Sequence, residues 1–208
     1  MKVLVACEFS GIVRNAFVAR GHDAWSCDLL PSETEGNHIQ GDVLEILDQG
    51  WDLMIGHPPC THLATSGAAW FKYKRKEQKL ALVFFLSLLQ APIKRICLEN
   101  PMSVISTRII KPSQVIQPYW FGDEEQKTTW LWLKNLPPLQ STKMVKPVLI
   151  AYKSKDTKSG YKLYPRWHQV GGGKDRGHNR SRTFRGIAEA MADQWGSLPL
   201  DWKEGFGL

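Results

Sequence analysis

Two short motifs, each at the end of an apolar run, constrain the fold of this chain most strongly. Residues 57–61, His-Pro-Pro-Cys-Thr, follow the apolar run 52–55, and residues 98–101, Leu-Glu-Asn-Pro, end the run 93–98. Short continuous apolar runs are typical of parallel strands that are buried on both faces. Because parallel strands end at the same edge of a sheet, Cys60 and Glu99 are predicted to emerge together there. Ligands of open α/β sheets bind at that edge.

The remaining pattern alternates between strands and helices. This order predicts a doubly wound, Rossmann-like α/β sheet in a single domain, 1–208. A later hairpin is also predicted, in which residues 128–133 pair with residues 144–152. The other predicted strands are 3–6, 24–27 and 38–40, and the predicted helices are 11–20, 43–47, 77–89 and 184–195.

Composition excludes several classes of protein. The chain has 208 residues, 43% of them hydrophobic and 23% charged, which is ordinary for a globular protein. It has no apolar run of membrane-spanning length, and Glu8 interrupts its N-terminal apolar run too early for a signal peptide. We therefore expect a cytoplasmic protein with no membrane contact and no obligate protein partner. The four cysteines show no metal-binding spacing, so no metal is expected and the thiols should stay reduced.

The net charge of +7 is concentrated in one stretch. Residues 151–185 contain ten basic and two acidic residues, a net charge of +8, and the rest of the chain is close to neutral. Tyrosines and a tryptophan are interleaved among the cations, a mixture suited to phosphates and stacked bases. This mixture predicts a nucleic-acid contact, with Arg166, Arg180 and Arg182 as candidate substrate-binding residues. The region 135–181 is accordingly predicted to be a small basic recognition insertion, although a solvated surface loop would show the same charge run.

Three successive strand ends carry residues of the type that binds an adenosine-containing cofactor. Phe9, Ser10 and Gly11 follow the first strand and open a helix, where backbone N–H groups can face a ligand. Asp28 ends the second strand and is placed to bind ribose hydroxyls. Asp42 follows the third and is placed to accept from an adenine amino group. Each aspartate alone is more commonly a helix cap, but the three ends together favour a cofactor site.

In this order the motifs resemble the cytosine-C5 DNA methyltransferase family, and in particular its compact members from phages and prophages. That family has a Phe-x-Gly loop after its first strand, an acidic residue after the second and Gly-Asp after the third. Pro-Cys follows its fourth strand and Glu-Asn its fifth. The chain matches all five positions, with Phe9-Ser10-Gly11, Asp28, Gly41-Asp42, Pro59-Cys60 and Glu99-Asn100.

The resemblance implies an activity and roles for these residues. It implies transfer of a methyl group from S-adenosylmethionine to cytosine C5 in DNA, within a methyltransferase sheet. The Cys60 thiolate would add to C6 of the base, and Glu99 would stabilise the charge that develops in the ring. A target within a duplex would have to be flipped out. The resemblance also places Pro58 beside the cofactor and Asn100 beside the substrate.

The chain departs from the family at two motifs, and these departures leave the substrate open. Thr61 stands where the family has glutamine, and the arginine-rich motif is absent, so that Lys127 is the candidate to replace it. RNA or a free cytosine nucleotide would need less recognition surface than DNA. A catalytically inactive nucleic-acid-binding relative is a further alternative, although it would need neither Cys60 nor Glu99. An amino-methylating enzyme is disfavoured because that chemistry uses no thiol.

Overall fold

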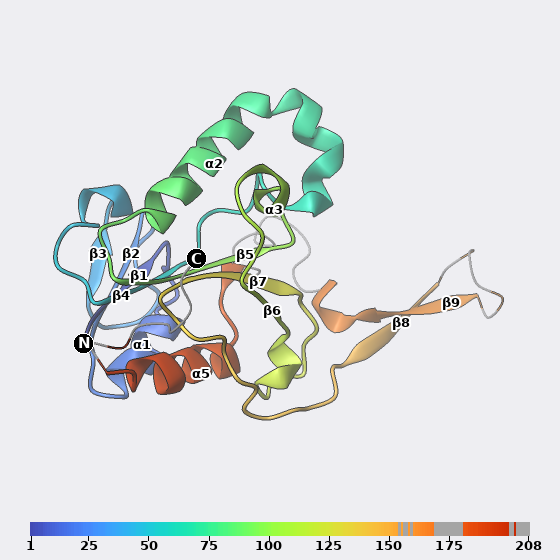
Figure 1. The fold of residues 1–208 in the computed structure, drawn as a ribbon. Coiled ribbons are helices and arrows are strands. Elements are labelled where there is room, and N and C mark those ends of the chain that lie inside the picture. Colours follow the sequence, from blue (N-terminus) through green and yellow to red (C-terminus); the bar gives the residue numbers. More distant parts are fainter. Residues whose placement is uncertain (154, 156–157, 159, 169–180, 200–201, 203–208) are drawn as a thin grey trace.

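The fold of the chain is built on a seven-stranded sheet (Figure 1). A computed structural model describes residues 1–153, 155, 158, 160–168, 181–199 and 202. The strands lie in the order β3-β2-β1-β4-β5-β7-β6, in which β7 is antiparallel to both of its neighbours and the first five strands are parallel. The strands are β1 (Lys2–Ala6), β2 (Asp23–Asp28), β3 (His38–Gln40), β4 (Leu53–Gly56), β5 (Arg95–Pro101), β6 (Gln114–Ile116) and β7 (Thr129–Lys134).

Helices cover both faces of this sheet. Helices α1 and α5 lie on one face and α2 on the other (Figure 1). The helices are α1 (Ile12–Val18), α2 (Arg75–Leu89), α3 (Ile105–Arg108) and α5 (Arg185–Gly196), and the 3₁₀ helices are η1 (Val43–Glu45), η2 (Thr65–Tyr73), η3 (Pro118–Trp120) and η4 (Arg166–His168). No helix among the described residues is long and apolar enough to cross a membrane.

The hydrophobic core has two parts, one on each side of the sheet. Phe17 of α1 and Trp195 of α5 are buried in the first part. Phe85 of α2 is buried in the second, and its ring makes an edge contact with Trp132 of β7. Strands β1 and β4 contribute side chains to both parts. Because both faces of these strands are buried, their sequences are continuously apolar and do not alternate with polar residues.

The predicted Rossmann-like α/β fold class is confirmed. The five parallel strands, the antiparallel β7 inserted between β5 and β6, and the helices on both faces make a doubly wound, Rossmann-like sheet. The parallel strands were predicted to within about three residues at either end, whereas β6 was not predicted at all.

The predicted hairpin between residues 128–133 and 144–152 is wrong. Strand β7 pairs with β5 and β6, because Leu131 and Trp132 are buried and need neighbours on both sides. Residues 149–153 instead form β8 (Leu149–Lys153), which pairs with β9 (Tyr161–Pro165). These two strands form a ribbon that extends away from the sheet (Figure 1). The assignment of residues 135–181 as a small basic recognition insertion within a single domain stays a prediction.

A fully buried arginine holds the connection between β2 and β3 against α1. The Arg14 guanidinium donates to the Ser26 hydroxyl at 3.0 Å, to the Thr34 hydroxyl at 2.7 Å and to the Glu35 carbonyl at 2.7 Å. Gly11 is required beside it, because its φ of +69° is left-handed and a Cβ there would lie 2.5 Å from the guanidinium. This cluster fixes the loop that follows β2.

Arg14→Gln is expected to lower the free energy of unfolding by about 3 kcal/mol, because it leaves buried oxygens without donors. Arg20→Gln is the matched control, since Arg20 pairs with the exposed Asp193 and should cost less than about 1 kcal/mol. Urea unfolding of the two variants measures both values. Equal losses would show that the Arg14 cluster does not hold the loop.

Candidate active site

Cys60 follows β4, and Glu99 lies near the end of the adjacent parallel strand β5. Gly56, the last residue of β4, is paired in register with Leu98 of β5, so the loop that carries Cys60 leaves the sheet directly beside Glu99. The carbonyl of Cys60 accepts from the amides of Leu63 and Ala64, both at 2.9 Å, and so begins a tight turn. Cys60 itself is exposed. The structure therefore brings the two sequence motifs to one edge of the sheet.

The cysteine loop is tied to β5 by a buried hydrogen bond. The Asn100 side-chain amide donates to the Pro58 carbonyl at 2.8 Å, and Asn100 is 1% exposed. Proline lacks an N–H group and restricts the backbone, so this carbonyl is presented in a fixed direction. Past the turn, the amide of Val104 donates to the Leu63 carbonyl at 3.0 Å. Asn100, predicted as a substrate contact, thus has a positioning role in the structure.

Glu99 is largely buried and lies against a histidine and a lysine. Its Oε2 is 3.4 Å from Nδ1 of His57, and the two side chains are 14% and 6% exposed. Burial raises the pKa of Glu99, but the charge of Lys127 and the hydrogen bond from His57 outweigh it, and the net pKa lies below the ordinary value. The carboxylate is therefore ionised at neutral pH. His57, the first residue of the motif that carries Cys60, is thus directed toward Glu99.

The other three cysteines have unreactive environments. Burial raises the pKa of Cys7 far above its usual range, and Asp28 adds to the effect. Burial likewise raises the pKa of Cys27 to about 11, and that of Cys97 well above its ordinary value. Since the thiolate is the nucleophile, these cysteines are chemically inert at neutral pH.

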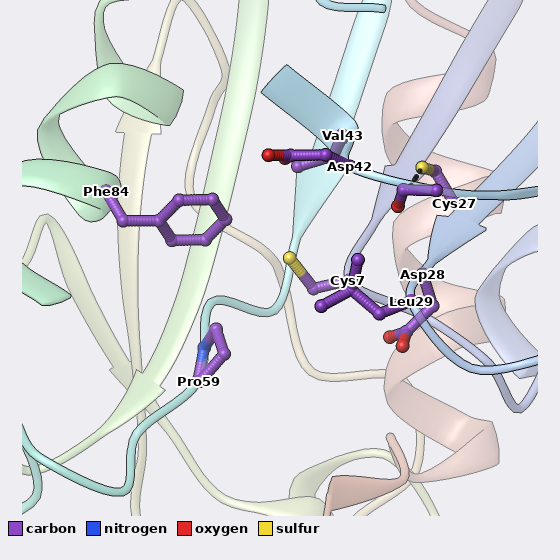
Figure 2. A pocket seen from close by; sticks show the side chains of 9 residues that line it. Cys7, Cys27, Asp28, Leu29, Asp42, Val43, Pro59 and Phe84 are labelled. Atoms are coloured by element: carbon purple, nitrogen blue, oxygen red, sulfur yellow. Dashed lines mark hydrogen bonds between the residues drawn. The ribbon is translucent and has the colours of Figure 1, made fainter. Parts of the chain in front are cut away.

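A cavity of about 270 Å³ lies at the ends of β1, β2 and β3. Its walls include an apolar side formed by Phe84 and Pro59, and the Asp42 carboxylate projects toward the ring of Phe84 (Figure 2). Asp28 and Asp42 both line it, and their assignment to a cofactor stays a prediction. One oxygen of each aspartate accepts a backbone amide, from Leu30 and Leu44 respectively. This combination of an aromatic ring and two carboxylates suits an adenosine group. Its base can stack on the ring of Phe84, and its hydroxyl and amino groups can donate hydrogen bonds to Asp28 and Asp42.

The other predicted cofactor residues lie outside the lining of this cavity. Phe9 and Ser10 are buried, and Gly11 begins α1. The first turn of α1 is occupied by Glu8, whose carboxylate accepts from the amides of Val13 at 2.7 Å and Arg14 at 3.1 Å. Pro59 lines the cavity in place of Pro58. The assignment of Phe9, Ser10, Gly11 and Pro58 to the cofactor stays a prediction.

The predicted basic substrate residues fall into three groups. Lys127 is brought to the site, where its charge acts on Glu99, and its Nζ lies 5.4 Å from the Trp167 ring centroid. Arg166 forms an ion pair with Glu125, and Arg182 forms one with Glu33. Arg180 lies outside the described residues. The described residues contain no group of three or more side chains that could hold a metal ion.

Sequence reasoning missed two residues of the candidate site. Phe84 lies in the middle of α2 and carries no motif, so only the packing of α2 over the strand ends reveals it. Cys7 carries no motif of its own and lines the cavity with a φ of +58°. Its place directly after β1 was the available signal.

Comparison with known proteins adds a likeness of fold. No family model and no curated protein matches the chain. Among solved structures, it is similar to one described as a "putative DNA modification methyltransferase encoded within prophage" of E. coli, with 15% identity and a TM-score of 0.45. The match covers 70% of this chain and 52% of that one, so the chain spans about half the length of that protein. At this identity the likeness concerns the fold alone.

Under native conditions at pH 8, one thiol per chain is expected to react rapidly with a chromogenic disulfide reagent. The reason is that Cys60 is exposed while burial raises the pKa of the other three thiols. Cys60→Ser should abolish the rapid phase, and unfolding should expose the three remaining thiols. A rapid phase that survives in Cys60→Ser would contradict this assignment.

Glu99 should make stability depend on pH in the acid range. Because its pKa is depressed in the folded state, its contribution is present above the unfolded pKa of about 4.3 and is lost as the pH falls through the folded value. Glu99→Gln should therefore lose less stability than the wild type between pH 6 and pH 3. Urea midpoints at the two pH values measure the difference, and parallel losses would contradict the depressed pKa.

Proposed function

We propose that the chain transfers a methyl group from S-adenosylmethionine to C5 of cytosine in DNA, through a covalent adduct with Cys60. The observation that supports it best is an exposed thiol on the loop after β4 and an ionised carboxylate in the adjacent strand β5, with the loop tied to that strand by the hydrogen bond from Asn100 to the Pro58 carbonyl. A protein that only bound nucleic acid would need neither group. The ordered resemblance to the cytosine-C5 methyltransferase family supports the same reaction.

The proposed cofactor fits the cavity beside Cys7, Asp28 and Asp42. Phe84 and Pro59 would contact the adenine, and the two aspartates would accept from the ribose hydroxyls and the adenine amino group. When bound, S-adenosylmethionine supplies an electrophilic methyl group. Pro59 is adjacent to Cys60 in the chain, so the cavity and the nucleophile share one loop.

The residues of the site divide the chemistry between them. The Cys60 thiolate forms a bond from Sγ to C6 of cytosine, and the electron pair of the C5–C6 double bond becomes available at C5. Glu99 accepts from the exocyclic amino group, and a proton taken up from water as the base binds is shared between its carboxylate and N3, which stabilises the charge that develops in the ring. After methylation the C5 proton passes to water, its bonding electrons re-form the C5–C6 double bond, and the electron pair of the bond from Sγ to C6 returns to sulfur as the thiolate. Lys127 and His57 keep Glu99 ionised and oriented before the base arrives.

Transfer of a labelled methyl group tests this reaction on DNA, on RNA and on free cytidine nucleotides. Cys60→Ser should remove transfer to DNA, and Glu99→Gln should lower the rate by about 10²-fold or more. Cys97→Ala is the matched control, because it removes a thiol from the same strand as Glu99 outside the site and should keep its activity. Equal transfer by the wild type and by Cys60→Ser would rule out the covalent route. Preferential transfer to RNA or nucleotides would contradict the DNA substrate.

A further inference from the structure

Exposed aromatic side chains are concentrated in two segments of this protein. Among the residues that the structure describes, all of the large exposed aromatic side chains belong either to η2 or to the β8–β9 ribbon. Exposed rings of this size are costly in water unless a partner covers them. The residues are Trp70 and Tyr73 in η2, and Tyr152, Tyr161 and Tyr164 in the ribbon.

The first segment, residues 70–79, combines aromatic rings with positive charge. Trp70 and Tyr73 are 65% and 68% exposed, and their ring centroids are 6.4 Å apart. The ammonium of Lys72 lies 4.7 Å from the centroid of the Tyr73 ring. Five basic residues stand between positions 72 and 79 against the single acidic residue Glu77. The segment therefore presents flat apolar faces bordered by cations.

Residues 70–79 are linked directly to the cysteine loop. The side-chain amide of Gln78 donates to the carbonyl of His62 at 3.1 Å, two residues after Cys60. At the start of η2, Thr65 donates from both its amide and its hydroxyl to the carbonyl of Met102, just past Glu99 and Asn100. Residues 70–79 are therefore held against the loop that carries Cys60.

The ribbon offers a second aromatic and basic surface on the Glu99 side of the site. Tyr152 and Tyr164 share one face of the ribbon with Lys162, and the two rings meet edge to face with centroids 6.0 Å apart. At the base of the ribbon Trp167 packs on Phe184, and Lys127 lies over both rings. The charge of Lys127 also acts on Glu99, so this lysine links the base of the ribbon to the carboxylate. The Cys60 loop and Glu99 are thus each connected to a surface of aromatic and basic residues.

We propose that these two surfaces bind single-stranded DNA, so that unpaired bases on either side of the target cytosine stack on them. Stacking on a protein ring requires a base face that no neighbouring base covers, and a duplex covers both faces of its bases. Cations that alternate with the rings suit the phosphates between successive bases. This inference rests on the proposed function, and it names unpaired cytosine as the substrate, which reaches Cys60 without the energy of flipping.

The positive charge of both surfaces also argues against a second copy of the chain as their partner. Residues 70–79 carry a net charge of +4, and the two strands of the ribbon contain Lys153 and Lys162 and no acidic residue. Two copies joined through either surface would bring like charges together at short range. A polyanion with exposed base faces satisfies both the charge and the rings.

Binding of labelled oligonucleotides to the Cys60→Ser protein without cofactor tests the proposal. Fluorescence anisotropy should show that a single-stranded DNA 20-mer binds at least about fivefold more tightly than the corresponding duplex. Trp70→Ala should weaken single-strand binding by about fivefold or more and leave duplex binding unchanged, whereas Trp70→Phe keeps a ring and should bind normally. Equal or tighter binding of the duplex would overturn the proposal, and so would tighter binding of single-stranded RNA.

The salt dependence of the same binding tests the basic part of the segment. Lys72→Gln should reduce the slope of log affinity against log salt by about 0.7 for single-stranded DNA, the value for one lost phosphate contact. Lys94→Gln is the matched control, because Lys94 is exposed and precedes β5 at the opposite edge of the sheet, so the slope should not change. Equal slopes for the wild type and Lys72→Gln would contradict a phosphate contact at Lys72.

Methyl transfer separates this inference from the function on which it rests. Binding of single strands that depends on Trp70, without methyl transfer to any substrate, would contradict the proposed function and support the binding surface. Methyl transfer to duplex DNA in preference to single strands, with Trp70→Ala fully active, would support the function and overturn the surface.

Discussion

The hydrogen bond from the Asn100 side chain to the Pro58 carbonyl joins the two halves of the candidate site. It is buried, 2.8 Å long, and connects a proline-stiffened loop to the end of the neighbouring strand. The bonds from Val104 to Leu63 and from Thr65 to Met102 hold the same loop further along the chain. Because β4 and β5 are paired in register, the bond from Asn100 is the one nearest to both Cys60 and Glu99 in the chain, and it fixes the start of the loop relative to the carboxylate. Removing the amide would leave a buried carbonyl without a donor as well.

The electrostatics of the site follow from how the chain distributes charge around Glu99. A largely buried carboxylate is ordinarily protonated more easily, and burial does raise the pKa of Glu99. Lys127 and His57 reverse this effect, so Glu99 is a charged hydrogen-bond acceptor. In the same protein burial raises the pKa of the thiols of Cys7, Cys27 and Cys97. Cys60 is the one exposed cysteine of the chain.

The sequence predicted the parallel half of the sheet and its two motifs, because short apolar runs and a proline pair are local signals. It did not predict β6 or the true partners of β7, since β5, β7 and β6 pair across long separations that no local pattern encodes. The interaction of His57 with Glu99 and the place of Phe84 in the cavity depend on tertiary packing in the same way. Basic residues were recognised by type, but ion pairs such as Arg166 with Glu125 can be seen only in the structure.

The most direct test of a covalent role for Cys60 is to trap its adduct. Single-stranded DNA containing 5-fluorocytosine, incubated with the protein and S-adenosylmethionine, blocks the loss of the C5 substituent and holds the bond from Sγ to C6. Intact mass spectrometry followed by peptide mapping should find one oligonucleotide per chain, attached at Cys60, and none on Cys60→Ser. Methyl transfer to ordinary cytosine without any trapped complex, or an adduct at another cysteine, would contradict the account.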